Sequence, residues 1–458
     1  MNINPYMFRQ YDIRGEVAVD FPEEVVIALG KAFGSLVKRR GGKKISLSGD
    51  VRTTTPLLKS YFMEGVLSTG LDVVDIGILP TPINYYSVFV MDDVDGACQI
   101  TGSHNPPEFN GFKLTYDKRP FFGDSIQDML NLIQADDFEI GAGQSSTYDI
   151  LPQYMDHVPA KIKLDRPMRI VVDAGNAAAS ICAVDFYEKI GCEVTPLFCE
   201  IDGTFPNHHP DPTVEKNLLD IKAEIKKGGY DAGVAFDGDA DRLGLIDEKG
   251  NVVWADYQMI IFAKEVIKSK ADHIIFDVKC SQALEEKITE YGGTPVMYKT
   301  GHSLIKDKML ELNSPFSGEM SGHLFFADDY YGYDDAIYNG ARMLQLLSRQ
   351  DKTLSELVDA LPKYVSTPEL RLNCINDEEK FRIASEAEAY FNAKYDCITV
   401  DGVRIKFGDG WGLVRASNTQ PVLVCRFEAK TAERMEEIQK LVIDKIQSIG
   451  EVELDEGH

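Results

Sequence analysis

TGSHNPP, residues 101–107, is the stretch around which the rest of the chain is organised. It follows GACQI, residues 96–100, whose small apolar residues are typical of a central strand in a parallel sheet. Gly102 allows a tight turn, and the Asn-Pro-Pro end of the stretch stops a helix or strand from continuing at once. The sequence therefore predicts that Ser103 lies on a loop beside the His104 imidazole, as a candidate nucleophile or phosphate carrier. The alternative is a turn whose polar side chains only satisfy their own backbone.

Length and composition limit what kind of protein this is. With 458 residues the chain is too long for one hydrophobic core, so three or four domains of about 100–150 residues are expected. The 48 Lys and Arg residues against 73 Asp and Glu residues give a net charge of −25. Long-range repulsion therefore argues against nucleic acid and anionic membranes as partners, and an anionic substrate would need a local basic pocket.

The cysteine pattern and the N-terminal sequence indicate the cellular compartment in which the protein is expected. Eight cysteines are scattered without paired spacing, which is typical of reduced, buried thiols in the cytoplasm. The start, MNINPY, lacks the basic and apolar segments of a signal peptide. No apolar run approaches the roughly 18 residues that a membrane span needs. We therefore expect a cytoplasmic protein, and no feature of the sequence indicates an obligate protein partner.

A unit of strand, loop, helix, glycine and strand occurs three times. Its first strand covers 44–50 and ends in Asp50 in the first copy, covers 168–173 in the second, and covers 273–277 in the third. This order predicts a βαβ unit with a right-handed crossover. Because the copies begin a little over a hundred residues apart, they indicate three related α/β domains. Each copy also has a polar loop after a later strand, and loops at the carboxyl ends of parallel strands are where such sheets bind ligands.

The chain from about Ser366 has a different pattern and predicts an α+β domain. Short strands alternate with one helix, Asp401-Gly402 is a type I′ hairpin signal, and the last helix is amphipathic. The predicted fold class is α/β, with three related βαβ domains of mixed sheets and a C-terminal α+β domain around a central cleft. The expected domain boundaries are 1–148, 149–251, 252–363 and 364–458.

DGDADR, residues 237–242, is the candidate metal site. Asp237, Asp239 and Asp241 alternate between two apolar strands, and a divalent cation is the usual reason to hold repelling carboxylates together. An EF-hand calcium loop is one alternative, but Arg242 stands where that loop requires glycine, and strands rather than helices are expected on both sides. A few carboxylates beside an arginine suit Mg²⁺, which leaves positions open for a phosphate oxygen. A structural acidic turn is the other alternative.

Two further loops have side chains suited to a sugar phosphate. Glu319 and Ser321, in the loop 318–323, can hold vicinal hydroxyls by paired hydrogen bonds. Arg415, at the start of 415–421, combines a guanidinium with the small hydrogen-bonding side chains that would capture a non-reacting phosphate. The alternative interpretation is that the loop 318–323 only caps its own backbone and that the basic residues are solvated surface charges. Further positive charge near the special loops comes from Arg14, Lys113, Lys279 and His302.

The sequence resembles the α-D-phosphohexomutase family, in particular its bacterial phosphomannomutase/phosphoglucomutase branch. The resemblance covers essentially the whole chain and rests on segments that occur in the family order. These segments are YDIRG (11–15), TGSHNPPEFNGFK (101–113), DGDADR (237–242), KTGHS (299–303), GEMSGH (318–323) and GWGLVRASNTQP (410–421).

The resemblance implies a role for each matched residue. Ser103 would carry the phosphoryl group and, with Asp237, Asp239 and Asp241, would bind Mg²⁺. The residues expected near the transferring group are Arg14, His104, Lys113, Arg242 and His323. The residues expected at the substrate are Tyr11, Lys279, His302, Glu319, Ser321, Arg415, Ser417, Asn418 and Thr419.

The activity implied is reversible phosphoryl transfer between C1 and C6 of a hexose phosphate, mannose or glucose or both. It would proceed through phosphoserine and a glucose or mannose 1,6-bisphosphate, which also serves as activator. Lys113 or His323 would be the base, and the sequence leaves both open. Phosphoglucosamine mutase is the alternative within the family, although its sugar loop usually has Gln where Met320 stands. A non-catalytic calcium-binding protein is the alternative from another class, and it would leave Ser103 and the loop 415–421 without a role.

Overall fold

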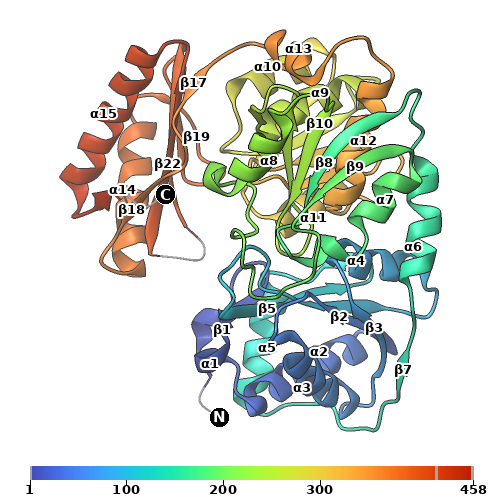
Figure 1. Cartoon of the computed structure of the whole chain (residues 1–458). Helices are drawn as coiled ribbons and strands as arrows, with labels where there is room; N and C mark the ends of the chain where they lie inside the picture. The colour runs from blue at the N-terminus through green and yellow to red at the C-terminus, as the bar shows by residue number, and fades with distance from the viewer. Residues whose placement is uncertain (1–2, 418–420, 455–458) are drawn as a thin grey trace.

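The computed structural model describes residues 3–417 and 421–454, which form four sheets with helices packed against them (Figure 1). Figure 1 shows the N-terminal part in blue at the bottom, the middle of the chain above it, and the C-terminal part in orange to red at the upper left, beside the middle part. None of the helices in the described part of the chain has the length and apolar character needed to span a bilayer. All eight cysteines are free thiols.

The first three sheets share one strand order, which confirms the three predicted βαβ repeats. The neighbouring strands run β3-β2-β4-β5 in the first, β9-β8-β10-β11 in the second and β14-β13-β15-β16 in the third. In each sheet the first three of these strands are parallel to one another and the fourth is antiparallel. The third strand of each series therefore ends in a loop at the carboxyl edge of the parallel strands.

The first sheet lies at the bottom of Figure 1, where β4 is buried at every residue, as expected of a central strand. Helices α2 and α3 pack on it through an apolar core that includes Phe33, Phe62 and Phe112. The elements are η1 (Pro5–Met7), β1 (Ile13–Glu16), α1 (Val17–Asp20), α2 (Glu23–Arg39), β2 (Lys44–Gly49), α3 (Thr55–Leu67), β3 (Asp72–Ile78), α4 (Thr81–Val90), β4 (Gly96–Ile100), β5 (Phe109–Tyr116), β6 (Arg119–Pro120), α5 (Asp124–Ala135) and β7 (Ser145–Thr147).

The second sheet carries the acidic loop between β10 and β11, both of which are buried at every residue. These flanks are strands, so the EF-hand alternative is wrong. The elements are α6 (Leu151–His157), η2 (Pro159–Lys161), β8 (Met168–Asp173), η3 (Ala178–Ile181), α7 (Ala183–Lys189), β9 (Cys192–Leu197), η4 (Glu215–Leu218), α8 (Leu219–Ile225), β10 (Ala232–Phe236), β11 (Leu243–Asp247) and β12 (Val252–Val253).

The third sheet shares a continuous apolar core with the second sheet and with α4 of the first. Every residue of α12 is buried, so this helix is a central element of that core. The elements are α9 (Ala255–Val266), β13 (His273–Asp277), α10 (Gln282–Glu290), β14 (Thr294–Tyr298), α11 (His302–Leu312), β15 (Phe316–Gly318), β16 (Leu324–Phe326), α12 (Ala336–Ser348) and α13 (Leu354–Asp359).

The fourth sheet has its own apolar core, formed with α14 and α15, and stands beside the others in Figure 1. The expected hairpin joins β19 to β20, but its turn is not type I′, because Gly402 has positive φ and Asp401 does not. The elements are β17 (Val365–Ser366), β18 (Leu370–Asn373), α14 (Asp377–Asn392), β19 (Asp396–Ile398), β20 (Val403–Lys406), β21 (Gly410–Ala416), β22 (Val422–Ala429), α15 (Ala432–Ile449) and β23 (Glu453–Leu454).

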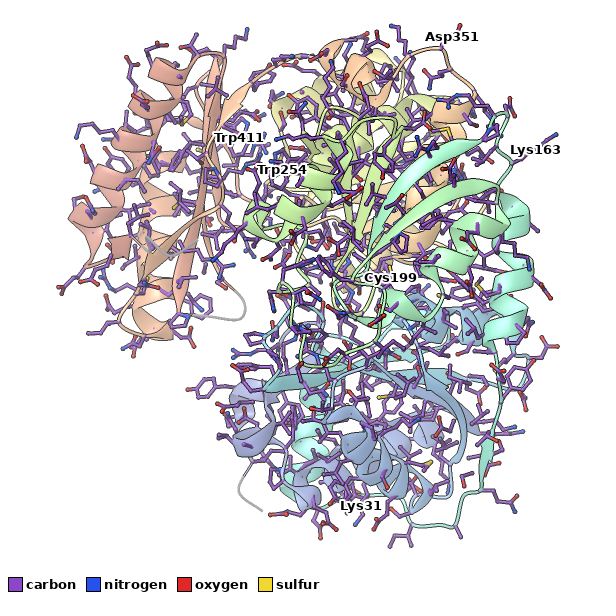
Figure 2. All side chains as sticks on the ribbon, in the orientation of Figure 1. Lys31, Lys163, Cys199, Trp254, Asp351 and Trp411 are labelled. Atoms are coloured by element: carbon purple, nitrogen blue, oxygen red, sulfur yellow. The ribbon has the colours of Figure 1, made fainter. Side chains whose placement is uncertain are left out.

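The fourth sheet contacts the third through a small apolar cluster and a buried arginine. Trp411 packs with Val278. Figure 2 shows Trp411 on the side of the fourth sheet that faces the second and third sheets. The Arg404 guanidinium lies 3.7 Å from the centre of a Trp411 ring and donates to the carbonyls of Val278 and Cys280, each at 2.7 Å. These bonds join the fourth sheet directly to the segment that carries Lys279.

Candidate active site

The predicted loops from the first three sheets occupy equivalent places in the fold. The Ser103 loop follows β4, the acidic loop follows β10, and the loop with Glu319 follows β15. Each leads into an antiparallel strand, so each begins at the carboxyl edge of its parallel strands. Contacts between the loops bring this edge of one sheet against that of the next.

Ser103 is fully buried and its hydroxyl faces the acidic loop of the second sheet. Its Oγ lies 2.9 Å from Oδ2 of Asp237 and 3.2 Å from Nδ1 of His104. Its backbone has φ of 49°, the left-handed region that non-glycine residues rarely adopt. A Cβ at Gly238 would lie 2.1 Å from the Ser103 carbonyl oxygen, so only glycine allows the two loops to come this close.

Asp237, Asp239 and Asp241 converge in a fully buried cluster. Lys113 Nζ donates to Oδ2 of Asp239 at 2.7 Å and to Oδ2 of Asp241 at 2.5 Å. At the start of α4, the Thr81 hydroxyl donates to Asp239 at 2.5 Å and its backbone N–H donates to the Asp239 carbonyl at 2.9 Å. The cluster is therefore held by side chains of the first sheet on one side and by its own strands on the other.

In the part of the chain that the structure describes, the cluster has perturbed carboxyl groups and oxygens without a hydrogen-bond partner. Burial and the charges of Asp241 and Asp239 raise the pKa of Asp237 well above its ordinary value. Burial also acts on Asp239, but the Lys113 ammonium outweighs it and lowers the pKa of that carboxyl. Among the described residues, Oδ1 of Asp239 and Oδ1 of Asp241 are buried without a hydrogen-bond partner.

These orphaned oxygens fit a divalent metal. One oxygen from each of the three carboxylates can be chosen so that all lie within 4.8 Å of one another. Hard divalent cations prefer such oxygen ligands, and a bound cation would satisfy both orphaned atoms. The acidic loop therefore has the composition, burial and geometry that a metal site requires.

His323 lies between Arg242 and a carboxylate that the sequence did not single out. Arg242 Nε donates to His323 Nε2 at 3.0 Å, and His323 Nδ1 lies 2.9 Å from Oδ2 of Asp334. Because Nε2 accepts, a neutral His323 carries its proton on Nδ1. Asp334 also accepts from Lys306 Nζ at 2.8 Å.

The candidate sugar-binding residues of the third sheet surround the same centre. The His302 ring stacks on the His323 ring, with 5.3 Å between the ring centres. The Tyr11 ring packs edge-on against His302, with 5.6 Å between the ring centres. Burial, followed by the Lys306 charge, lowers the pKa of His302 well below its ordinary value. Glu319 accepts from the Gly301 N–H at 2.6 Å, and burial raises the pKa of its carboxyl. Ser321 is half-buried on the same loop.

Lys279 and Arg415 connect the third and fourth sheets. Lys279 Nζ lies 3.2 Å from Oε2 of Glu369, and the Lys279 charge lowers the pKa of Glu369 to about 2. Arg415 is buried and its Nε donates to Oδ2 of Asp401 at 3.0 Å, while the Thr300 N–H donates to the same oxygen at 3.0 Å. Ser417, two residues after Arg415, is also buried. The predicted residues Asn418 and Thr419 lie outside the part of the chain that the structure describes.

Arg14 and His104 lie beside the Ser103 loop. Arg14 pairs with Asp12 at 2.6 Å and reaches Oδ1 of Asn105 at 3.4 Å. Burial, followed by the charges of Arg242 and Arg14, lowers the pKa of His104 well below its ordinary value. His104 is therefore neutral near pH 7 and adds no charge to the crowded centre.

Comparison with known proteins covers nearly all of the chain. Family models described as phosphoglucomutase/phosphomannomutase alpha/beta/alpha domains I, II and III match residues 6–139, 152–250 and 254–364, and the model of the C-terminal domain matches 369–445. The phosphomannomutase/phosphoglucomutase of Pseudomonas aeruginosa is 41% identical over 446 residues, 97% of this chain and 96% of that protein. The chain belongs to the phosphoglucomutase/phosphomannomutase family.

Two further relatives support the same assignment. The phosphoglucomutase of Neisseria meningitidis serogroup A is 41% identical over 96% of each chain. The crystal structure of a phosphoglucomutase/phosphomannomutase family protein from Burkholderia thailandensis superimposes with a TM-score of 0.92 at 39% identity. That match covers 98% of this chain and 100% of the other.

Several residues of this phosphohexomutase site were missed from the sequence. Thr81, Asp334, Glu369 and Asp401 each contact a predicted site residue, and for Thr81 and Glu369 that residue lies in a distant part of the chain. Asp401 was assigned to a turn, because Asp-Gly is the commonest hairpin signal. Asp334 gave a signal only as one of two adjacent acids before an apolar helix, which is an ordinary helix start.

Proposed function

We propose that the chain catalyses reversible phosphoryl transfer between C1 and C6 of glucose or mannose phosphates, with phosphorylated Ser103 as the carrier. The observation that carries the proposal is the Ser103 hydroxyl, 2.9 Å from a buried carboxylate of a neighbouring sheet, at the centre of a cationic and acidic cluster. Membership of a family whose relatives are named for this activity supports it.

The reaction balances in two half-steps. First the bond between Ser103 Oγ and phosphorus breaks and a bond between phosphorus and a sugar hydroxyl oxygen forms, which gives a hexose 1,6-bisphosphate. The bisphosphate then turns, and its other phosphoryl group returns to Ser103 Oγ. This chemistry is mainly positioning and charge neutralisation, which suits a centre built from carboxylates, lysine and arginines.

Asp237, Asp239 and Asp241 would hold Mg²⁺. When bound, the metal supplies positive charge to the oxygens of the transferring phosphoryl group. Lys113 and Thr81 hold the carboxylates in place, and Arg14 and Arg242 add further charge next to Ser103. Magnesium suits the site better than calcium because the loop offers few protein oxygens, whereas calcium takes six to eight ligands.

Lys113 and His323 are both candidates for the base that takes the sugar hydroxyl proton, and neither has a free lone pair in this arrangement. Burial acts to lower the pKa of Lys113, but the charges of Asp239 and Asp241 outweigh it and raise the pKa, so Lys113 is a cation here. The Nε2 lone pair of His323 accepts from Arg242 Nε at 3.0 Å. His323 would therefore take the proton only if Arg242 moved away from Nε2, and Lys113 only if it first lost a proton.

The substrate would lie between the third and fourth sheets and the Ser103 loop. Glu319 and Ser321 would bind the sugar hydroxyls, with Tyr11, Lys279 and His302 around them. The arginine loop, with Arg415, Ser417, Asn418 and Thr419, would hold the phosphate that is not reacting. Because the bisphosphate turns between half-steps, this one phosphate site would serve both orientations of the sugar.

A coupled mutase assay tests the proposal. Purified protein is supplied with Mg²⁺, a trace of glucose 1,6-bisphosphate, and glucose 1-phosphate, mannose 1-phosphate or glucosamine 1-phosphate in parallel. We expect turnover of the glucose or mannose phosphate, or of both. Preference for glucosamine 1-phosphate would move the substrate to the amino sugar, and metal binding without turnover of any sugar would overturn the proposal.

A further inference from the structure

Arg52 is a buried arginine in the loop between β2 and α3, and all five of its guanidinium N–H groups donate hydrogen bonds. Its Nε donates to Oδ2 of Asp50 at 3.1 Å. The four remaining N–H groups donate to backbone carbonyls of the segment 103–109. These bonds run from Nη2 to Ser103 O at 2.7 Å and Asn105 O at 2.6 Å, and from Nη1 to Pro106 O at 2.6 Å and Phe109 O at 3.0 Å.

Asp50 completes the attachment from the other side of Ser103. Its Oδ2 accepts from the Thr101 hydroxyl at 2.7 Å and from the Gly102 N–H at 3.2 Å. The Thr101 hydroxyl oxygen in turn accepts from the Ser103 N–H at 2.8 Å. The amide of Ser103 is thus tied to Asp50 through Thr101, and its carbonyl is tied directly to Arg52.

This attachment explains how Ser103 keeps a backbone conformation that is rare for serine. The φ of 49° lies in the left-handed region, and such conformations persist where the surroundings over-determine them. At this φ the Ser103 hydroxyl points to Asp237, 2.9 Å away. Without the bonds to Asp50 and Arg52, the peptide on either side of Ser103 could relax and turn the hydroxyl away.

The second domain closes over Arg52, so a substrate cannot reach it. The Phe205 ring lies 5.3 Å from the guanidinium, and a Cβ at Gly203 would lie 2.3 Å from the Val51 carbonyl oxygen. His209 Nε2 also contacts the His104 carbonyl. These contacts come from residues 203–209, the covering segment of the second domain. Figure 2 shows Cys199, a few residues before this segment, at the junction of the first and second domains.

We propose that Arg52, together with Asp50, is a positioning residue for phosphoryl transfer, which fixes the Ser103 backbone so that its hydroxyl faces the acidic cluster. The inference rests on the proposed role of Ser103 as phosphoryl carrier. It assigns to Arg52 no contact with substrate, because the side chain is fully buried and all its donors are occupied within the protein. Its loss should therefore slow the transfer step and leave substrate binding nearly unchanged.

Arg52→Lys is the test variant. Lysine keeps the charge, but its single ammonium has three donors and no planar fork, so it cannot reach the Asp50 carboxylate and four carbonyls together. We expect kcat to fall about tenfold to a hundredfold, because small misplacements of a reacting group have costs of that size. The KM for glucose 1-phosphate should change by less than about threefold.

Arg342→Lys is the matched control. Arg342 is another buried arginine, on α12, and bonds to Asp328, Glu265 and Tyr338 away from the proposed site. The control should lower the melting temperature without lowering kcat. An equal loss of kcat in both variants would make the effect one of general stability and would overturn the inference, as would an unchanged kcat or a change confined to KM in Arg52→Lys.

Amide hydrogen exchange of the segment 101–109 gives a readout that does not need activity. It should be faster in Arg52→Lys than in the unaltered protein or in Arg342→Lys, and equal exchange would overturn the inference. If the unaltered protein has no mutase activity, the proposed function fails while the exchange comparison still judges the attachment. If Arg52→Lys does not fold, Thr101→Val removes one link of the same attachment and should give faster exchange and a smaller loss of kcat, with KM again unchanged.

Discussion

The Ser103 hydroxyl faces a loop with three buried carboxylates. A bound cation, and a phosphoryl group on Ser103 that the cation would neutralise, account for this arrangement. The hydroxyl can donate one hydrogen bond, and it does so to Asp237. The orphaned oxygens of Asp239 and Asp241 remain for another group. A phosphoryl group on Ser103 would bring more negative charge, so the carrier role and the metal role depend on each other.

Replacing the hydroxyl tests the carrier role. Ser103→Ala should remove nearly all mutase activity, because alanine has no side-chain oxygen to carry the phosphoryl group. Intact-mass measurement of the unaltered protein should show a phosphorylated fraction that peptide mapping places at Ser103, and the variant should lack it. Ser87→Ala, which removes another buried serine hydroxyl, is the control and should keep both activity and phosphorylation. Full turnover by Ser103→Ala would contradict the assignment.

Removing one carboxylate tests the metal site. In the metal-free protein, burial and then the charges of Asp241 and Asp239 disfavour the ionised form of Asp237, so the pKa of this carboxyl is raised. Asp237→Asn should therefore raise the melting temperature of chelator-treated protein by a few degrees. The same variant should lose the stabilisation that Mg²⁺ gives to the unaltered protein, and most of its activity. Thermal melts with EDTA and with Mg²⁺ measure both effects, and equal stabilisation by Mg²⁺ in the two proteins would contradict the site.

Sequence was informative about the residues whose roles are local. The turn chemistry of 101–107 and the alternating acids of 237–242 are visible within a few positions. Arg52 and Thr81 were not predicted, because their partners lie far along the chain and become neighbours only when it folds. Asp334 lies near His323 in sequence, but two acids before an apolar helix are typical of an ordinary helix start. Arg52 in particular looks like a surface arginine in the sequence, and its burial follows from the covering segment of the second domain.

At the scale of elements, the ends of strands and helices determine where the polar side chains meet. The strands β4, β10 and β15 were predicted from apolar runs that end at polar loops, and their equivalent positions in three sheets confirm the repeat. Helix ends contribute too: α4 begins at Thr81, whose hydroxyl holds Asp239. A helix start thus helps to hold the acidic cluster, and sequence periodicity alone does not reveal such a role.

Asp335 caps α12 and gives a pH-dependent test of the central core. Its carboxylate accepts from the Tyr338 N–H and from the hydroxyls of Tyr154 and Tyr330, and burial raises its pKa to about 6. The folded protein therefore binds a proton that the unfolded chain releases near pH 4, and the stability gained from it is lost as the pH rises from about 4 to about 6. The whole loss is at most about 3 kcal/mol, since a tenfold change in acidity corresponds to about 1.4 kcal/mol.

Asp335→Asn should remove this loss, because asparagine can cap the helix without a charge. We expect the variant to match the unaltered protein near pH 4 and to be the more stable of the two by pH 7. Chemical denaturation at several pH values measures the difference. Asp124→Asn, which removes an exposed carboxylate at the start of α5, is the control. A stability difference that does not change with pH would contradict the raised pKa.

At the scale of the whole molecule, the fourth domain differs from the other three in its core and in its contacts. The first three sheets are linked through one continuous core, whereas the fourth has a separate core. Arg404 and Arg426 attach it to the segment 278–280 by bonds to backbone carbonyls. The fourth domain therefore meets the site through the backbone around Lys279 and through Arg415, and the sequence predicted only the second of these.

Arg415→Ala tests what the fourth domain contributes. Arg415 is buried, is held by Asp401, and comes from a domain without the acidic or serine loop, so its proposed task is to hold the phosphate that is not reacting. A charge-assisted arginine contact is typically worth about 1.5–3 kcal/mol, so kcat/KM should fall about tenfold to a hundredfold. Arg415→Lys keeps the charge but not the fork and should recover only part of the loss.

The loss in Arg415→Ala should be similar for glucose and mannose phosphates. In the proposed arrangement the arginine loop would bind phosphate, whereas the two sugars differ at a hydroxyl that Glu319 and Ser321 would contact. Arg434→Ala, which breaks an exposed pair with Asp409 in the same domain, should leave the kinetics of both substrates unchanged. Steady-state kinetics of the three variants on both substrates decides the matter. An effect confined to one sugar would mean that the fourth domain selects the hexose, and the roles of the arginine loop and the Glu319 loop would have to be exchanged.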